Sequence, residues 1–99
     1  MSRVRHAVLF RWKPDVTSEH VAAAESALAE LPAKVPSIRS YLFGRNLGIN
    51  PGTFDYAVIA EFDDVDGYLE YRDHPDHKDF IATYTADYVA DRAAIQMEF

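Results

Sequence analysis

Two histidines and a tyrosine lie within seven positions of one another in one short stretch of the chain. The stretch runs Tyr71-Arg72-Asp73-His74-Pro75-Asp76-His77-Lys78-Asp79-Phe80. A neutral imidazole near pH 7 can take a proton from a substrate. A positioned tyrosine hydroxyl can donate a hydrogen bond to an oxygen on which negative charge develops. This pattern predicts general acid–base chemistry, with His77 as the base and Tyr71 as the hydrogen-bond donor.

Pro75 divides this stretch into two helical segments. Proline disfavours helical geometry at the residue before it and is favoured at the first position of a helix. One short helix is therefore expected to end at His74, which would cap the next helix, and His77 would lie in the first turn of that helix. There the positive helix end disfavours a protonated imidazole. The apolar side of this helix is predicted to consist of His77, Ile81, Tyr84 and Tyr88.

A third histidine, His6, lies in a stretch of alternating polarity at residues 3–12. Its companions on one face of the predicted strand are Val4, Val8, Phe10 and Trp12, and the opposite face carries Arg5, Ala7, Leu9 and Arg11. The face of His6 is nearly all apolar, so helices should cover it. Burial there would lower the pKa of His6 and keep the ring neutral. The competing interpretation for His6, Tyr71 and His77 is simple packing in the core.

The remaining elements follow from periodicity and from helix-ending residues. Thr17 is the expected N-cap of a helix of about 15 residues whose buried stripe is Val21, Ala24, Leu28 and Leu31, and the prolines at 32 and 36 should mark its exit. His20 on this helix is expected to be exposed to solvent. Strands are predicted at residues 38–47, with an irregularity at Gly44, at 54–62 and at 93–99.

The order of these elements is β-α-β-β-α-β, the ferredoxin-like arrangement of the α+β class. It predicts one domain spanning residues 1–99, with a four-stranded antiparallel sheet and all helices on one face. The other face of the sheet would carry Ala7, Leu9, Ala57 and Ile59, which are too apolar for water. Two such faces would cover each other in a homodimer.

Composition argues against several other classes of protein. The net charge of −6, with no extended cluster of Lys or Arg, argues against binding to nucleic acid or to anionic membranes, and no apolar run approaches the roughly 18 residues of a membrane span. The chain has no cysteine, and a cytoplasmic protein is expected. A metal site at Asp73, His74 and His77 would match no strong signature. The acidic residues at 63, 64 and 66 are more simply a capping loop, so neither a metal nor a cofactor is predicted.

Two segments resemble the stress-responsive A/B-barrel (Dabb) family. They are His6-Ala7-Val8-Leu9-Phe10-Arg11-Trp12-Lys13 and the stretch from Tyr71 through His74-Pro75-Asp76-His77 to Phe80. The order of elements and the length agree with the family over essentially the whole chain. The resemblance implies a dimeric α/β barrel built from two ferredoxin-like sheets.

The resemblance also implies roles for individual residues. One plant branch of the family contains a polyketide cyclase, which closes a poly-β-keto chain by aldol chemistry without a cofactor. Its catalytic tyrosine and histidine match Tyr71 and His77, and a further pocket histidine matches His6. Ala24 and Leu28 stand where the cyclase has aromatic side chains, which argues against the same substrate. The predicted substrate-binding residues are His6, His74, Phe80 and Tyr84.

Three functions are compatible with this pattern. The first is a cofactor-free enzyme or binder for an apolar, carbonyl-bearing, polyketide-like small molecule, because the predicted wall is aliphatic and aromatic with few polar groups. The second is a non-catalytic stress-responsive dimeric module in which the same residues are packed. The third is a cofactor-independent monooxygenase, an activity found among related dimeric barrels.

Overall fold

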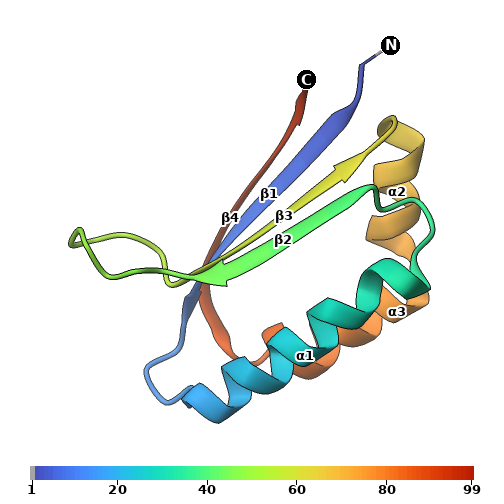
Figure 1. Cartoon of the computed structure of the whole chain (residues 1–99). Helices are drawn as coiled ribbons and strands as arrows, with labels where there is room; N and C mark the ends of the chain where they lie inside the picture. The colour runs from blue at the N-terminus through green and yellow to red at the C-terminus, as the bar shows by residue number, and fades with distance from the viewer. Residues whose placement is uncertain (1) are drawn as a thin grey trace.

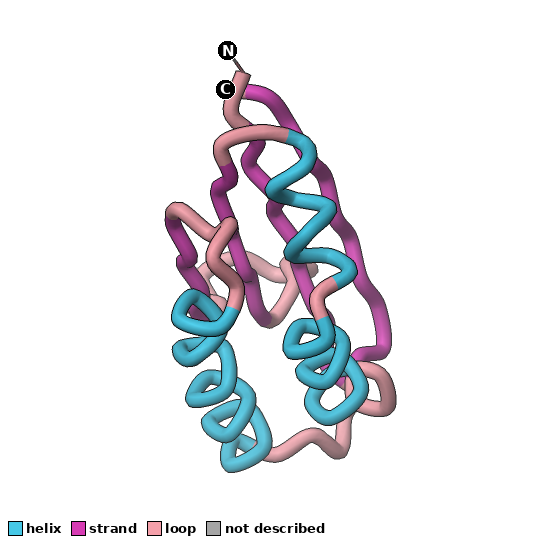
Figure 2. Tube along the Cα trace, turned by 90° about the vertical axis from the view of Figure 1, so that its right-hand side faces the viewer, coloured by secondary structure: helices cyan, strands magenta, loops and turns pink. Residues whose placement is uncertain are grey.

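A four-stranded antiparallel sheet with three helical segments on one of its faces makes up the structure, a computed structural model that describes residues 2–99. The elements are β1 (Val4–Trp12), α1 (Ser18–Lys34), β2 (Ser40–Arg45), β3 (Tyr56–Phe62), α2 (Val65–Asp73), α3 (Pro75–Phe80), η1 (Ile81–Thr85) and β4 (Val89–Glu98). Figure 1 shows all helices below the sheet, and Figure 2 shows α1 beside the α2–α3 pair. The predicted α+β, ferredoxin-like arrangement is confirmed.

The strand order β2-β3-β1-β4 places the first strand of the chain beside the last. In this register His6 lies opposite Ala60 of β3 and Gln96 of β4. Side chains alternate between the two faces of a strand. His6 therefore points toward the helices together with Val8 and Phe10, as the alternation of residues 3–12 predicts.

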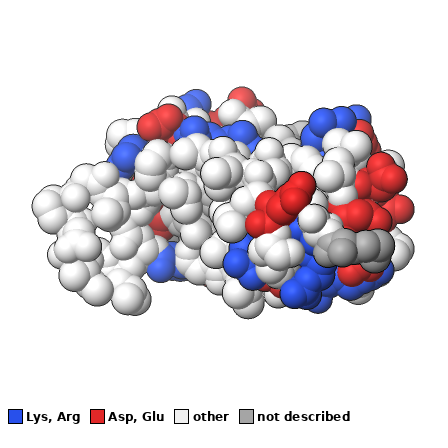
Figure 3. All heavy atoms as spheres, turned by 90° about the horizontal axis from the view of Figure 1, so that it is seen from above, with Lys and Arg blue, Asp and Glu red and all other residues white. Residues whose placement is uncertain are grey.

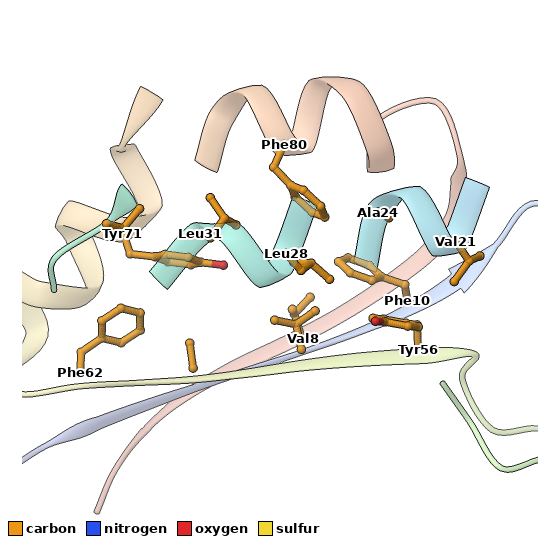
Figure 4. Packing of buried hydrophobic residues seen from close by; sticks show 13 residues of the cluster. Val8, Phe10, Val21, Ala24, Leu28, Leu31, Tyr56, Phe62, Tyr71 and Phe80 are labelled. Atoms are coloured by element: carbon orange, nitrogen blue, oxygen red, sulfur yellow. The ribbon is translucent and has the colours of Figure 1, made fainter. Parts of the chain in front are cut away.

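The core fills the space between the sheet and the helices. Figure 4 shows Phe10 and Tyr56 rising from the strands toward α1, with Phe80 descending from α3 above Leu28. All four side chains are at least nine-tenths buried. The predicted stripe of Val21, Ala24, Leu28 and Leu31 is the buried face of α1, and the Thr17 side chain caps that helix by accepting from the backbone N–H of His20.

Several predicted boundaries are wrong by a few residues. Helix α1 passes through Pro32 and continues to Lys34, because a proline can be held near a helix end at the cost of one hydrogen bond. Strand β2 has six residues, and its pairing with β3 runs through Gly44 without a bulge. Strands β3 and β4 begin at Tyr56 and Val89 rather than at residues 54 and 93.

The last helical region differs most from its predicted form. Residues 81–85 form a π-helical turn, in which each backbone N–H bonds five residues back, as Ala86 does to Ile81. The wider turn breaks the spacing on which the predicted apolar side depended, and Ile81 and Tyr88 expose 40% and 36% of their surface.

The prediction that His20 is exposed is also wrong. Its ring stacks on that of Tyr88 with 3.8 Å between centroids, and its Nε2–H donates to the Tyr84 carbonyl at 2.9 Å. The side chain is half-buried because it joins the start of α1 to the π-helical turn. None of the helices in residues 2–99 has the length and apolar character needed to span a membrane.

Candidate functional site

A cavity of about 480 Å³ opens between the sheet and the α2–α3 region, and His6, Tyr71 and His77 all line it. His6 comes from the middle of β1, Tyr71 from the last turns of α2 and His77 from α3. The other lining residues are Val8, Phe10, Leu28, Tyr41, Val58, Tyr68, Arg72, Phe80, Ile81, Thr85, Ala86, Val89 and Arg92. The structure thus brings the three predicted chemical groups to one apolar-walled space.

The break at His74-Pro75 positions His77 above Tyr71. The backbone of His74 is extended (φ −65°, ψ 135°), its N–H donates to the Tyr71 carbonyl at 3.3 Å, and its Nδ1 accepts from the backbone N–H of Asp76 at 3.1 Å. His74 therefore ends α2 and caps α3. This turn stacks the rings of Tyr71 and His77 with 4.0 Å between their centroids and 30° between their planes.

The protonation state of His77 follows from its partner. Its Nδ1 lies 3.2 Å from the Arg72 carbonyl oxygen, which can only accept, so Nδ1 carries the proton and Nε2 keeps a free lone pair. Burial lowers the pKa of His77 below 6.5, the Arg72 carbonyl partly opposes this, and the Arg92 charge adds to the lowering. Near pH 7 the ring is neutral and can accept a proton at Nε2.

His6 has the complementary tautomer. The Gln96 side-chain amide donates to His6 Nδ1 at 2.9 Å, so the proton of the neutral ring is on Nε2. Burial lowers the pKa of His6 from 6.5 to about 4, with smaller contributions from the charges of Arg92 and His77. The side chain is only 4% exposed. His6 is therefore a neutral hydrogen-bond donor across a wide pH range.

Tyr71 is joined to a second tyrosine, on the edge strand β2. Its hydroxyl lies 2.8 Å from that of Tyr41 on β2. Burial raises the pKa of Tyr71 to about 12, and the hydrogen bond with Tyr41 partly offsets that rise; the pKa of Tyr41 is also raised by burial. Both hydroxyls stay protonated at neutral pH, so they donate hydrogen bonds rather than carry charge.

Two of the predicted substrate-binding residues lie apart from this cavity. Phe80 and His6 line it, but His74 and Tyr84 are not among its lining residues. Tyr84 packs against Phe80 with 5.3 Å between ring centroids and faces a shallow depression between α1 and α3. The predicted contact of His74 and Tyr84 with a ligand therefore gains no support from the shape of the cavity.

Sequence analysis missed three polar residues of β4 and α2 at the site, which are Arg92, Gln96 and Tyr68. Arg92 and Tyr68 line the cavity, Gln96 binds His6, and the Tyr68 ring lies 5.1 Å from that of His6. The signal for β4 was present, because Ile95 and Met97 point one way and the intervening residues must point the other. Arg92 lies before residue 93, where the predicted strand begins, whereas Gln96 lies within the predicted strand on the face opposite Ile95 and Met97.

The acidic residues near the site act in local structure. Asp64 caps α2 by accepting from the Gly67 N–H at 2.8 Å, and Asp63 pairs with Arg39 at 2.9 Å. Within residues 2–99 no three His, Cys, Asp or Glu side chains are grouped so as to hold a metal ion. This includes Asp73, His74 and His77, since Asp73 instead pairs with Arg72.

Comparisons with known proteins agree with this architecture. A dimeric ferredoxin-like protein of unknown function from Thermobifida fusca is 42% identical, with a TM-score of 0.92 over 99% of this chain and 92% of that one. A hydroxynitrile lyase from Passiflora edulis shares the fold, with a TM-score of 0.86 over 98% of this chain and 93% of that one, at 19% identity.

A relative known from its sequence also matches. A stress-response A/B barrel domain-containing protein of Arabidopsis thaliana is 26% identical over 89 residues, which cover 86% of this chain and 77% of the relative. The family model for the stress responsive A/B barrel domain matches residues 4–99. With nearly its whole length matched, the chain belongs to the stress responsive A/B barrel domain (Dabb) family.

Proposed function

We propose that this protein binds an apolar, carbonyl-bearing small molecule and moves protons on it without a cofactor. The observation that carries the proposal is one apolar-walled cavity lined by a neutral base, His77, and two neutral donors, His6 and Tyr71. Few precisely placed polar groups in an apolar hollow are typical of small-molecule sites. This arrangement favours the first of the three functions compatible with the sequence.

The proposed chemistry begins with a proton on the carbon alpha to the carbonyl. His77 Nε2 takes this proton, the electron pair of the broken C–H bond forms a C=C bond, and the π pair of the carbonyl moves to its oxygen to give an enolate. Tyr71 donates a hydrogen bond to that oxygen; in this step Tyr41 donates to the Tyr71 hydroxyl oxygen, which lies 2.8 Å from its own, and the Tyr71 proton is directed to the substrate. In an aldol closure the enolate carbon then attacks a second carbonyl, and the resulting alkoxide regains a proton from His77.

The Passiflora edulis protein with this fold is a hydroxynitrile lyase, and at 19% identity the likeness carries the fold alone. Cyanohydrin cleavage is therefore measured as a second activity in the experiment below and is not the proposed activity.

The experiment that tests the proposal measures hydrogen–deuterium exchange on simple ketones. Acetophenone and valerophenone are incubated with the protein in D₂O, and loss of the α-proton signal is followed by NMR. Exchange above the rate of buffer alone is the expected result, since a base that removes the α-proton returns a deuteron. Mandelonitrile cleavage and oxygen uptake with aromatic quinols are measured in parallel.

Each outcome selects one function. Exchange or cyanohydrin cleavage supports acid–base chemistry at a carbonyl. Oxygen uptake with quinols and no exchange would replace the proposal by the cofactor-independent monooxygenase. Absence of all three activities, with saturable ligand binding or without it, would leave the non-catalytic module and refute the proposed chemistry.

The proposal includes a homodimer formed through the helix-free face of the sheet. That face carries the apolar residues Leu9, Leu42, Ile59, Ile95 and Met97, of which Ile95 is 60% exposed. Figure 3, seen from above, shows a broad uncharged surface over the sheet and the β2–β3 loop, with charged groups gathered mainly toward the chain termini. An apolar surface of this kind favours a second copy, and the Thermobifida fusca relative is dimeric.

Replacing Ile95 with glutamate is expected to separate this dimer. Light scattering should give twice 11.2 kDa for the unmodified protein and a mass close to 11.2 kDa for Ile95→Glu at micromolar concentration, because the carboxylate would be buried without a partner. Val65→Glu is the matched control, since Val65 is 57% exposed on α2 in the helical layer. A monomeric unmodified protein would contradict the proposed interface.

A further inference from the structure

Arg92 brings a positive charge to the cavity in which His6, Tyr71 and His77 are neutral. It lies on β4 opposite Phe10, so it points to the helix-covered face, and it lines the cavity with His6, Tyr71 and His77. The other lining arginine, Arg72, pairs with Asp73 at 2.9 Å. Within residues 2–99 no hydrogen bond or ion pair links the Arg92 guanidinium to another side chain.

The cavity offers no carboxylate to balance Arg92. None of its lining residues is Asp or Glu. The neighbouring Asp91 lies opposite Arg11 in the sheet, and its carboxylate accepts the backbone N–H of Arg92. Arg92 is an exposed residue, so water solvates its guanidinium when no ligand is bound. A ligand with its own anionic group could pair with this charge, whereas an uncharged ligand could not.

Arg92 shares the cavity lining with the three chemical groups. Its charge adds to the lowering of the pKa of His6 and of His77 by burial, and it partly opposes the rise of the pKa of Tyr71. A guanidinium binds a carboxylate through two parallel N–H···O bonds and so fixes its orientation. A ligand held in this way would present the carbons next to its carboxylate end to His77 and Tyr71.

We propose that the cavity selects apolar keto acids, with the ligand carboxylate bound by Arg92 and the ligand carbonyl facing Tyr71 and His77. The carbonyl half of this statement rests on the proposed function. The carboxylate half does not, because Arg92 would bind the anion whether or not the protein turns the ligand over.

The test compares a keto acid with its uncharged methyl ester. Binding of benzoylpropionate and of its methyl ester is measured by isothermal titration calorimetry on the unmodified protein and on Arg92→Gln. We expect the acid to bind at least about tenfold more tightly than the ester, as befits a charge-assisted bidentate pair, and Arg92→Gln to remove that preference.

Two further variants separate the role of Arg92 from net charge and from folding. Arg39→Gln removes the same charge at an exposed pair with Asp63 outside the cavity, and it is expected to keep the preference. Arg92→Lys keeps the charge but lacks the planar guanidinium with its two parallel donors, so an intermediate preference for the acid over the ester is expected. This variant keeps the inference testable if Arg92→Gln does not fold.

Failure of this inference is distinct from failure of the proposed function. Equal binding of acid and ester by the unmodified protein, binding of neither, or a preference that survives Arg92→Gln would overturn the role of Arg92. A clear preference for the acid without α-proton exchange on either compound would support Arg92 and instead overturn the proposed catalysis.

Discussion

Replacing His77 with alanine is expected to lower the rate of α-proton exchange by about 10²–10⁴-fold, the usual contribution of a positioned general base. The neutral ring has its Nδ1–H bound to the Arg72 carbonyl, which leaves Nε2 as the acceptor that the reaction needs. NMR of ketone exchange in D₂O measures the rate. His77→Gln should lose about as much activity, since an amide can fill the space and donate hydrogen bonds but is no base.

Lys78→Ala is the matched control for this prediction. Lys78 is an exposed neighbour on α3 and does not line the cavity, so its removal should leave the exchange rate close to that of the unmodified protein. Light scattering should show the same assembly for all variants. Unchanged exchange in His77→Ala would remove His77 from the mechanism, whatever the activity of the protein.

The pH dependence of exchange offers a second view of the same residue. Burial and the Arg92 charge lower the pKa of His77 below 6.5, so the base stays unprotonated at pH values where an exposed histidine is already charged. The midpoint of the fall in exchange rate should therefore lie below pH 6.5. A fall centred above that value would point to a different base.

The second large expected effect is a loss of folding stability in acid, caused by protonation of His6. As the pH falls from 6.5 to about 4, the protein is expected to lose about 3 kcal/mol of its free energy of unfolding through this residue alone. Burial lowers the pKa of His6 to about 4 in the folded chain, whereas in the unfolded chain it stays near 6.5. Between these values only the unfolded state binds the proton, so protonation favours unfolding.

Urea unfolding at fixed protein concentration across this pH range measures the loss, with His6→Gln as the comparison. Glutamine cannot take up the proton, and its amide can bind Gln96, so the variant should lack the His6 part of the slope. Carboxylates that titrate near pH 4 affect both proteins equally and cancel in the difference. Equal slopes for the two proteins would show that folding does not lower the pKa of His6.

Local sequence signals determined most of the secondary structure and one part of the site. The alternation around His6 predicted the face that it occupies, and the His74-Pro75 pair predicted the helix break that stacks His77 on Tyr71. These features depend on residues close in the chain, where backbone geometry restricts the possible arrangements. The boundaries were less accurate because a π-helical turn and a proline inside α1 follow from packing rather than from periodicity.

The protonation states and the charge of the site were decided only by the tertiary structure. Gln96 reaches His6 across 90 residues, and Tyr41 reaches Tyr71 across 30. Both contacts exist because the strand order places β4 beside β1 and β2 beside β3. A tautomer or a pKa depends on such partners and on burial, and neither is encoded in the spacing of one segment. The sequence by itself thus determined which groups can transfer protons, whereas the fold decided which atom of each group holds one.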